Sequence, residues 1–443
     1  MSIRLSNKAL IYNTLFIFLF FFCNSVKAQY TWNSDSAFKA GSHNSGRLWG
    51  YMFGDYYYKG HSDSLNRGGN NQYSGIPQNR NAFQFRRIYL GYDYNISKKF
   101  AAELLLAAED NFPAFNPPSS AATSGDELLN NKLSFYIKLA NIRVKNIWKW
   151  TDLILGQQAT PSFPLISERI WSYRSIERTI ADIRRTPSYD FGAGLQGKFD
   201  AKGNYGYDLL IANGTSAKPA SNSFKWFYAD IFAYFMDKKL VLDLYADYQR
   251  LNWQPGWHHD RQMIKGYAAY SFPSTATAGN SDLTIGAEGF VNTIKADSKA
   301  TLIAGGADTI STAAHGISFF VHGNIVKNKL RFFARYDSYN PNKNINNGKY
   351  SNYAAVSSPG GYNTPGYRIV YNPGTGSPTS ATSTGDITSR ESFITAGLDF
   401  TPYKGVHFMP NIWYNHYSSQ MTGVSNRDYD LVYRMTFYYV FGK

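Results

Sequence analysis

The 443-residue chain carries 45 Lys and Arg against 31 Asp and Glu, a net charge of +14 with histidine counted as neutral. A basic excess favours anionic partners, but these cations are scattered among acids, so no concentrated basic stripe indicates nucleic-acid binding. The single cysteine, Cys23, excludes an internal disulfide and a thiolate metal site.

The N-terminal segment has the pattern of a secretory signal peptide. Two cations precede an apolar run over residues 10–22, and the small-x-small sequence VKA follows at 26–28. No later run of 18 or more apolar residues provides a helical anchor. The sequence therefore predicts a signal peptide at 1–28 and an exported outer-membrane β-barrel over 29–443.

Aromatic residues are unusually frequent, with 35 Tyr, 31 Phe and 9 Trp. Outer-membrane barrels carry such side chains in girdles at both membrane interfaces. A mean hydropathy of -0.38 is compatible with a barrel, because only every second residue of a spanning strand faces lipid. The alternative to a membrane barrel is a soluble, secreted β-sandwich that is rich in tyrosine.

Side chains of alternating character recur along the chain at the period of two that belongs to β-strands. In one such run, Ile88, Leu90 and Tyr92 share one face, and Arg87 and Asp93 share the other. The pattern predicts sixteen strands, at residues 46–59, 87–94, 102–108, 133–139, 153–155, 190–199, 205–211, 226–236, 240–249, 263–272, 283–294, 317–326, 330–337, 394–400, 406–417 and 431–441.

The connections between these strands alternate between short and long. Tight turns are predicted at 95–99, 200–204, 237–239, 327–329 and 402–405, with two longer turns at 141–150 and 273–282. Polar loops without regular structure are predicted at 110–131, 161–189, 213–225, 252–261, 296–314 and 338–390. Barrels with short periplasmic turns and long external loops show this asymmetry, which a sandwich has no reason to show.

The final run alternates almost to the terminus, with Leu431, Tyr433 and Met435 on one face and Val432 and Arg434 on the other. We expect it to pair with the first strand, because lipid does not tolerate an open sheet edge. The predicted fold class is all-β, a 16-stranded antiparallel transmembrane barrel.

The loop at 161–189 is rich in arginine, and guanidinium groups stay charged and pair with anionic oxygens. Folded into a water-filled lumen, this loop would narrow the path and set the charge that a solute meets. Alternatively, its arginines pair with acids and hold the loop against the wall. The predicted constriction residues are Arg169, Arg174, Arg178, Arg184 and Arg185, with Glu168, Glu177 and Asp182 as the neighbouring acids.

Further arginines are predicted on the inner face of the wall, at Arg87, Arg331, Arg335 and Arg434. They share that face with several acids, so the predicted wall is mixed in charge. The acids include Asp93, Glu103, Asp243, Asp247, Asp337 and Asp399.

Several stretches resemble the porins of the phosphate-selective O and P type, spread over most of the mature chain. They are GRLWGYMFGDYYY at 46–58, FQFRRIYLGYDYNISKKF at 83–100, LILGQQATPSF at 153–163, the arginine-rich segment 167–199, FFARYDSYNPN at 332–342 and LVYRMTFYYVF at 431–441. The resemblance implies a 16-stranded, homotrimeric outer-membrane channel with an inward third long loop. It covers Arg86, Arg87, Gly156, Gln157, Arg178 and Arg335.

One feature of that family is missing here. Its phosphate-selective members carry a lysine-rich fifth long loop, whereas residues 252–261 read NWQPGWHHDR and contain no lysine. This difference weighs against phosphate as the solute.

Two short motifs are candidates for binding sites. The G-x-G-x-x-G pattern at 192–197 lies inside a predicted strand, so it indicates space for the folded loop and not a nucleotide site. His258, His259 and Asp260 are adjacent in a predicted loop and lack a further fixed ligand, so no metal site is predicted. Neither G-x-S-x-G nor H-E-x-x-H occurs, so no catalytic residue is predicted.

The sequence therefore predicts a Gram-negative outer-membrane porin for the passive diffusion of small hydrophilic solutes, with small anions such as phosphate preferred. Its expected partners are outer-membrane lipid and further copies of itself in a homotrimer. No cofactor is expected. The alternatives are a secreted or surface β-rich protein that binds a ligand without conducting, and an outer-membrane hydrolase.

Overall fold

The structure is a computed structural model of the chain. The expected signal peptide at 1–28, Arg185 and most of the predicted 338–390 loop lie outside the described residues. The structure describes residues 44–64, 67, 72–73, 76–109, 128–129, 132–184, 187–220, 223–254, 257–273, 281–355, 387–422 and 427–442.

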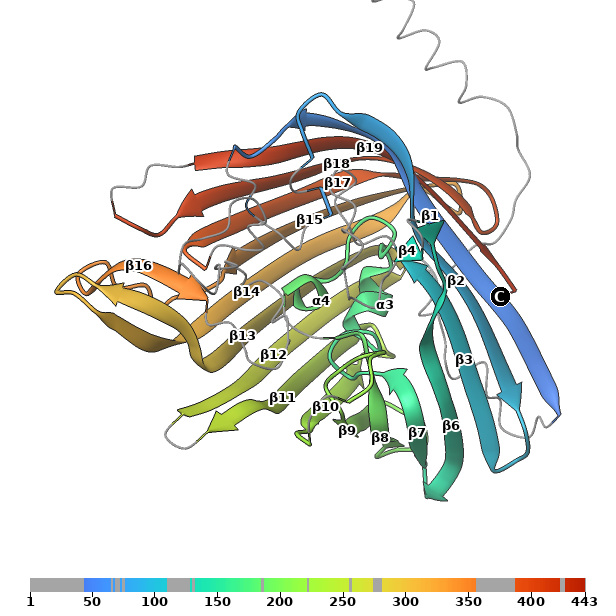
Figure 1. The fold of residues 1–443 in the computed structure, drawn as a ribbon. Helices are drawn as coiled ribbons and strands as arrows, with labels where there is room; N and C mark the ends of the chain where they lie inside the picture. Colours follow the sequence, from blue (N-terminus) through green and yellow to red (C-terminus); the bar gives the residue numbers. More distant parts are fainter. Residues whose placement is uncertain are drawn as a thin grey trace, which may run out of the picture.

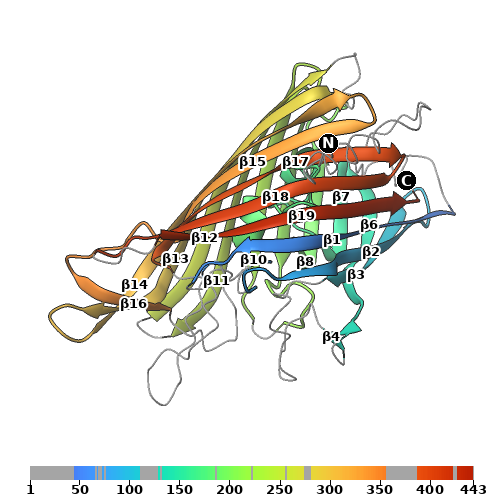
Figure 2. The ribbon, with the colours of Figure 1, turned by 90° about the horizontal axis from the view of Figure 1, so that it is seen from above.

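Sixteen strands of the described part of the chain form one closed antiparallel sheet (Figures 1 and 2). Each strand pairs with the next, and the last pairs with the first from Gly50 opposite Phe441 to His61 opposite Leu431. The predicted closed 16-stranded barrel is confirmed. The strands are β1 (Ser45–His61), β2 (Asn81–Asn95), β3 (Phe100–Glu109), β6 (Tyr136–Trp148), β7 (Thr151–Ala159), β8 (Tyr189–Lys198), β9 (Tyr205–Ala212), β10 (Trp226–Phe235), β11 (Leu240–Gln254), β12 (Trp257–Pro273), β13 (Ser281–Leu302), β14 (Ala307–Val326), β15 (Leu330–Asn340), β17 (Ser389–Tyr403), β18 (Val406–Ser419) and β19 (Arg427–Phe441).

The remaining elements are short. Strands β4 (Leu128–Leu129) and β5 (Lys132–Leu133) pair with each other, and β16 (Tyr350–Ala355) pairs with the outer end of β13. Two one-turn helices, α3 (Ser167–Trp171) and α4 (Ile180–Arg184), lie in the connection between β7 and β8. No helix in the residues that the structure describes is long and apolar enough to cross a membrane.

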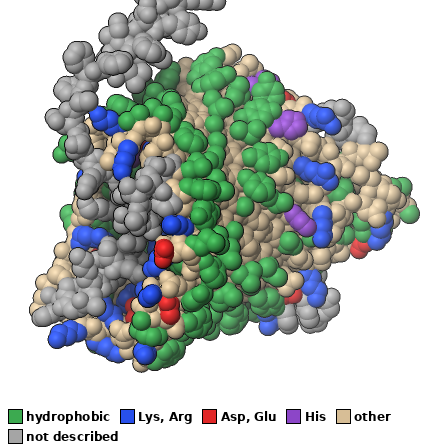
Figure 3. Space-filling view, turned by 180° about the vertical axis from the view of Figure 1, so that it is seen from behind, with side chains coloured by type: hydrophobic (Ala, Val, Ile, Leu, Met, Phe, Trp, Pro, Cys, Tyr) green, Lys and Arg blue, Asp and Glu red, His purple; other side chains and the backbone are tan. Residues whose placement is uncertain are grey.

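Side chains alternate between the two faces of the wall as the sequence predicts. On β11, Leu242 and Leu244 are 43% and 52% exposed on the outside, whereas Val241, Asp243 and Tyr245 between and beside them are buried. Hydrophobic side chains gather over the outer face of the barrel, with charged side chains to either side of them (Figure 3). This separation suits a wall that meets lipid outside and polar groups inside.

Three segments predicted as loops or turns are strands instead. Residues 296–314 belong mostly to a hairpin in which β13 and β14 run out to a turn at 303–306, and 252–261 is the end of the β11–β12 hairpin. The predicted turn at 141–150 is largely β6. In 296–314, polar and small residues hide the alternation, because beyond the apolar band neither face has to be hydrophobic. The predicted 338–390 loop also contains β16.

Two β-bulges turn basic side chains inward. The register of β1 with β2 shifts between Phe53 and Gly54, which leaves Arg86 as the extra residue beside Arg87, and both arginines are buried. The register of β3 with β6 shifts in the same way at Lys138. The alternation over the predicted strand 133–139 would place Leu139 on the lipid face together with Ile137, but the bulge turns Leu139 to the inside, where it is buried.

The buried core lies inside the barrel, where the segment 160–188 packs against the wall (Figure 1). Its apolar residues Phe163, Ile180 and Ala181 cluster with inward side chains of β9 to β15. A second group clusters with β11, β12, β14, β15 and β18, and consists of Ile166, Trp171, Tyr173 and Ile176. The segment between β7 and β8, called here the inner loop, therefore packs inside the barrel and forms a buried core together with the inner face of the wall.

Candidate functional site

Glu177 is the most connected anchor of the inner loop. Its Oε2 accepts a hydrogen bond from Trp413 Nε1 of β18 at 2.9 Å, and its backbone carbonyl accepts one from Trp171 Nε1 at 2.9 Å. The side chain is buried. Glu177 therefore fixes the centre of the loop through its carbonyl and attaches the loop to the wall through its carboxylate.

The charge of Glu177 is stabilised by its surroundings. Burial alone raises the pKa of this carboxyl, but the nearby cations Arg86, Arg178 and Arg434 outweigh burial and lower the pKa to about 2. The carboxylate is therefore charged throughout the physiological pH range.

Further polar contacts hold the loop to the same side of the barrel. Arg86 NH1 donates to the carbonyls of Ser175 and Ile176 at 3.2 and 3.1 Å. Three contacts reach β13, β14 and β17: Glu288 Oε1 accepts from the Ala181 amide at 3.1 Å, His322 Nε2 lies 2.9 Å from the Ile170 carbonyl oxygen, and Tyr173 OH donates to Asp399 Oδ2 at 3.3 Å.

Two of the predicted constriction arginines help to hold the loop in place, Arg184 by contacts to the wall and Arg178 by contacts within the loop. Arg184 is buried, pairs with Glu391 of β17 at 2.5 Å and lies over the Tyr339 ring. Arg178 lies 3.9 Å from Glu177 and 4.0 Å from Asp182. Both arginines contribute to attachment of the loop.

The other two described constriction arginines, Arg169 and Arg174, line a cavity beside the loop. Arg174 forms ion pairs with both Glu168 and Asp182. Burial raises the pKa of the Glu168 carboxyl, and Arg174 offsets this only in part. The predicted constriction arginines therefore differ in position, since Arg169 and Arg174 line the cavity and Arg184 contacts the wall.

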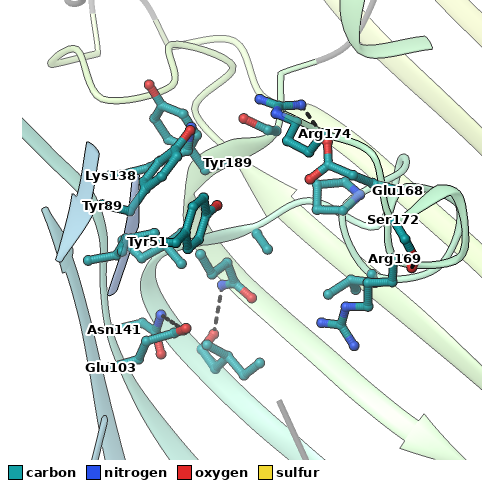
Figure 4. A pocket seen from close by; sticks show the side chains of 18 of the residues that line it. Tyr51, Tyr89, Glu103, Lys138, Asn141, Glu168, Arg169, Ser172, Arg174 and Tyr189 are labelled. Carbon is teal, nitrogen blue, oxygen red and sulfur yellow. Dashed lines mark hydrogen bonds and ion pairs between the residues drawn. The ribbon is translucent and has the colours of Figure 1, made fainter. Parts of the chain in front are cut away.

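The cavity separates the inner loop from one half of the barrel wall (Figure 4). Its wall side comes from β19, β1, β2, β3, β6, β7 and β8, whereas the loop packs mainly on β9 to β18. The open space is therefore off centre. On the wall side, it is lined by Tyr51, Tyr89, Glu103, Lys138, Asn141 and Tyr189 among others.

Lys138 is a basic residue of the cavity that sequence analysis did not single out. Its ammonium group pairs with Glu109 and lies 5.0 and 4.9 Å from the ring centroids of Tyr89 and Tyr189. Glu109 also pairs with Arg87 at 2.5 Å. The signal that could have found it is the alternation itself, because Ile137 on the outside already points Lys138 inward.

The other predicted wall arginines lie on the inner face but do not line this cavity. Arg335 pairs with Asp337 and donates to the Arg178 carbonyl. Arg331 donates to His322 Nδ1 at 3.0 Å. Arg434 Nε donates to Asn411 Oδ1 at 2.7 Å, and its NH1 donates to Tyr73 OH at 3.3 Å.

Tyr73 belongs to a second inward contact, made by the connection between β1 and β2. Its hydroxyl donates to Asp55 Oδ2 at 2.6 Å, and its carbonyl accepts from Lys59 Nζ at 2.7 Å. Lys59 also pairs with Asp430 at 2.5 Å, and both side chains are fully buried. The contacts with β19 were not expected from sequence, because Arg434 lies 361 positions from Tyr73 and Asp430 lies 371 positions from Lys59.

The two motifs weighed on sequence serve other purposes. Gly192 and Gly197 lie in β8, where an added Cβ would fall 2.0 Å from the Ile211 carbonyl oxygen and 2.3 Å from the Tyr207 ring. The neighbouring strand, and not the inner loop, is therefore the reason for these glycines. Over the described residues, no cluster of three or more His, Cys, Asp or Glu could hold a metal ion.

The chain matches no family model and no curated protein sequence. It is similar in structure to the outer-membrane channel DcaP of Acinetobacter baumannii, with 9% identity, 91% of this chain and 99% of that chain covered, and a TM-score of 0.56. It is also similar to an anion-selective porin from Comamonas acidovorans, with 12% identity, 90% of this chain and 99% of that chain covered, and a TM-score of 0.52. Salmonella typhi OmpF in complex with daunomycin has 10% identity, with 90% of this chain and 98% of that chain covered, and a TM-score of 0.50. At these identities the likeness establishes the fold, which is that of outer-membrane porins.

Proposed function

We propose that this protein is an outer-membrane porin, a water-filled channel through which small hydrophilic solutes diffuse passively. The observation that carries the proposal is the closed barrel whose inner loop fills one half of the lumen and leaves a polar-lined cavity along the other. The chain begins with a predicted export signal, and the outer face of the wall is apolar, which suits outer-membrane lipid. No catalytic role is proposed.

The inner loop is proposed to be the constriction of the channel. Four cationic side chains line the cavity, Arg169, Arg174, Lys138 and Arg143, against the two carboxylates Glu103 and Glu168. In a narrow path with low-dielectric walls, such an excess favours anions. The excess is modest, because Arg174 shares its charge with two acids. Small anions are therefore preferred, with phosphate as one candidate and not a dedicated substrate.

The homotrimeric assembly implied by the resemblance to O and P type porins is also part of the proposal. A native gel of tagged and untagged chains assembled together would test it, because trimers with different numbers of tags differ in mass. A single band for the mixture would contradict a trimer.

Planar-bilayer recording tests the channel and its selectivity together. Purified protein should open steps of current in KCl, and a salt gradient should give a reversal potential on the anion-selective side. Replacing Arg169, Arg174 and Arg178 with alanine should lower the anion preference. If the reversal potential stays unchanged, these arginines act only in attachment.

The matched control removes three exposed arginines at the external rim, by alanine substitution of Arg80, Arg390 and Arg427. At 1 M salt the Debye length is about 3 Å, so rim charges should not affect the reversal potential. A preparation that opens no channels overturns the porin and favours a ligand-binding β protein.

A further inference from the structure

The wall side of the cavity carries a continuous aromatic surface. The Tyr51 ring lies 4.5 Å from Tyr89, 6.1 Å from Tyr438 and 6.4 Å from Phe53, centroid to centroid, and is parallel to Phe53 within 6°. All four rings, together with Tyr189, line the cavity. Tyr51 and Tyr438 are only half-buried. They offer ring surface to whatever occupies the space between wall and loop.

The opposite side of the cavity is polar and mixed in charge. The inner loop contributes Glu168, Arg169, Ser172 and Arg174, which lie across the open space from Tyr51 (Figure 4). Because Arg174 is paired with Glu168, this side offers strong donors and strong acceptors next to each other.

The lower part of the wall continues the same arrangement. Glu103 Oε2 accepts from Asn141 Nδ2 at 3.0 Å. Arg143 pairs with Asp152 at 2.9 Å and donates to Gln196 Oε1 at 2.8 Å. Donors and acceptors therefore alternate along the path instead of forming a run of one sign.

These two unlike faces fit one class of solute best. A simple anion would use the cations and gain nothing from five aromatic rings, and an apolar ring would displace water from the charged groups without offering them a hydrogen bond. A sugar has a C–H face that stacks on an aromatic ring and a rim of hydroxyls that donate and accept at once. We infer that this cavity is a sugar-binding site that a mono- or disaccharide occupies on its way through the channel.

The inference rests on the proposed channel function and names its substrate class. The site binds weakly, since a solute that binds tightly would not leave the channel. Tyr51 and Tyr438 are proposed to determine it, because both rings are partly accessible and lie next to each other on the aromatic surface.

The experiment measures how sugars interrupt the KCl current of the full-length mature protein in planar bilayers. Glucose is compared with sorbitol, which is an open chain of nearly the same mass and without a ring, and with benzoate as an aromatic anion. We expect glucose to reduce the current saturably and sorbitol to act only through viscosity. Equal effects of glucose and sorbitol, or block by benzoate alone, would overturn the inference.

Substitutions locate the site. Tyr51→Ala and Tyr438→Ala should each raise the half-blocking glucose concentration about threefold, when the block is expressed as a fraction of each variant's own KCl conductance. Tyr51→Phe, which retains the ring, should bind glucose like the unmodified protein. Tyr433→Ala, on the lipid face of the same strand as Tyr438, is the matched control and should change nothing. Unchanged glucose block in both inner variants refutes the assignment.

The outcome separates this inference from the proposed function. If the protein forms no conducting channels in KCl, both are overturned. If it conducts normally but glucose produces no saturable block, only the sugar site is lost.

Discussion

Replacing Glu177 with glutamine should loosen the inner loop without opening the barrel. The carboxylate holds Trp413 on the wall and lies in a cluster of arginines. Its pKa is about 2 instead of the usual 4.5, a difference that corresponds to about 3 kcal/mol in favour of the charged form. Glutamine has nearly the same shape and can still accept a hydrogen bond from the Trp413 indole. The stabilisation lost should therefore be close to this electrostatic contribution.

The same argument fixes the pH dependence. Because the pKa is lowered in the folded protein, the stabilisation is fully present above about pH 4.5 and is lost as the pH falls toward 2. In bilayer recordings, the current of the unmodified protein should become noisy as the pH falls through this window. Glu177→Gln should already be noisy at pH 7 and should lose this acid response.

Glu168→Gln is the matched control, because it makes the same substitution in the same loop. The pKa of Glu168 is raised by burial, so its charged form is not favoured and its loss should not release the loop. The reasoning is refuted if the Glu177→Gln channel shows no extra current noise at pH 7 and becomes noisy at low pH like the unmodified protein.

Two further substitutions test the wall. Lys59→Met should leave the fully buried Asp430 without its cation. It should lower the free energy of unfolding in lipid vesicles, measured by urea titration, by about 3–5 kcal/mol. The double variant with Asp430→Asn should recover most of the lost free energy. Gly156→Ala should reduce stability by about 1–3 kcal/mol, since Gly156 has φ +119° and an added Cβ would fall 2.4 Å from the Ala140 carbonyl oxygen. Gly266→Ala, where nothing lies within 4 Å, is its control, and equal urea midpoints would contradict the steric argument.

The barrel could be predicted from sequence because lipid and water make opposite demands on neighbouring residues. Tyr433 and Met435 had to differ from Val432 and Arg434, and the structure places these pairs on opposite faces of β19. The strand ends beyond the apolar band could not be predicted in the same way, because alternation is not required there.

The site was harder to predict, since it depends on contacts that sequence spacing does not encode. Arg184 pairs with Glu391, 207 residues further on, whereas Arg174, from the same loop, reaches the cavity. Nothing in the local sequence distinguishes the two arginines. Leu139 enters the lumen beside Lys138 through a bulge of one extra residue, which leaves no mark in composition.

The attachment of the inner loop to one side of the barrel divides the wall into two halves that accept change differently. Strands β9 to β18 lie under the loop and are constrained like the interior of a soluble protein, so most substitutions on their inner face should reduce folding. Strands β1 to β7 border the cavity, and apart from Arg86, which donates to the loop, side chains such as Tyr51 can be exchanged there with little effect on attachment. Permeation can therefore be redesigned on one half while the other half preserves the shape of the opening.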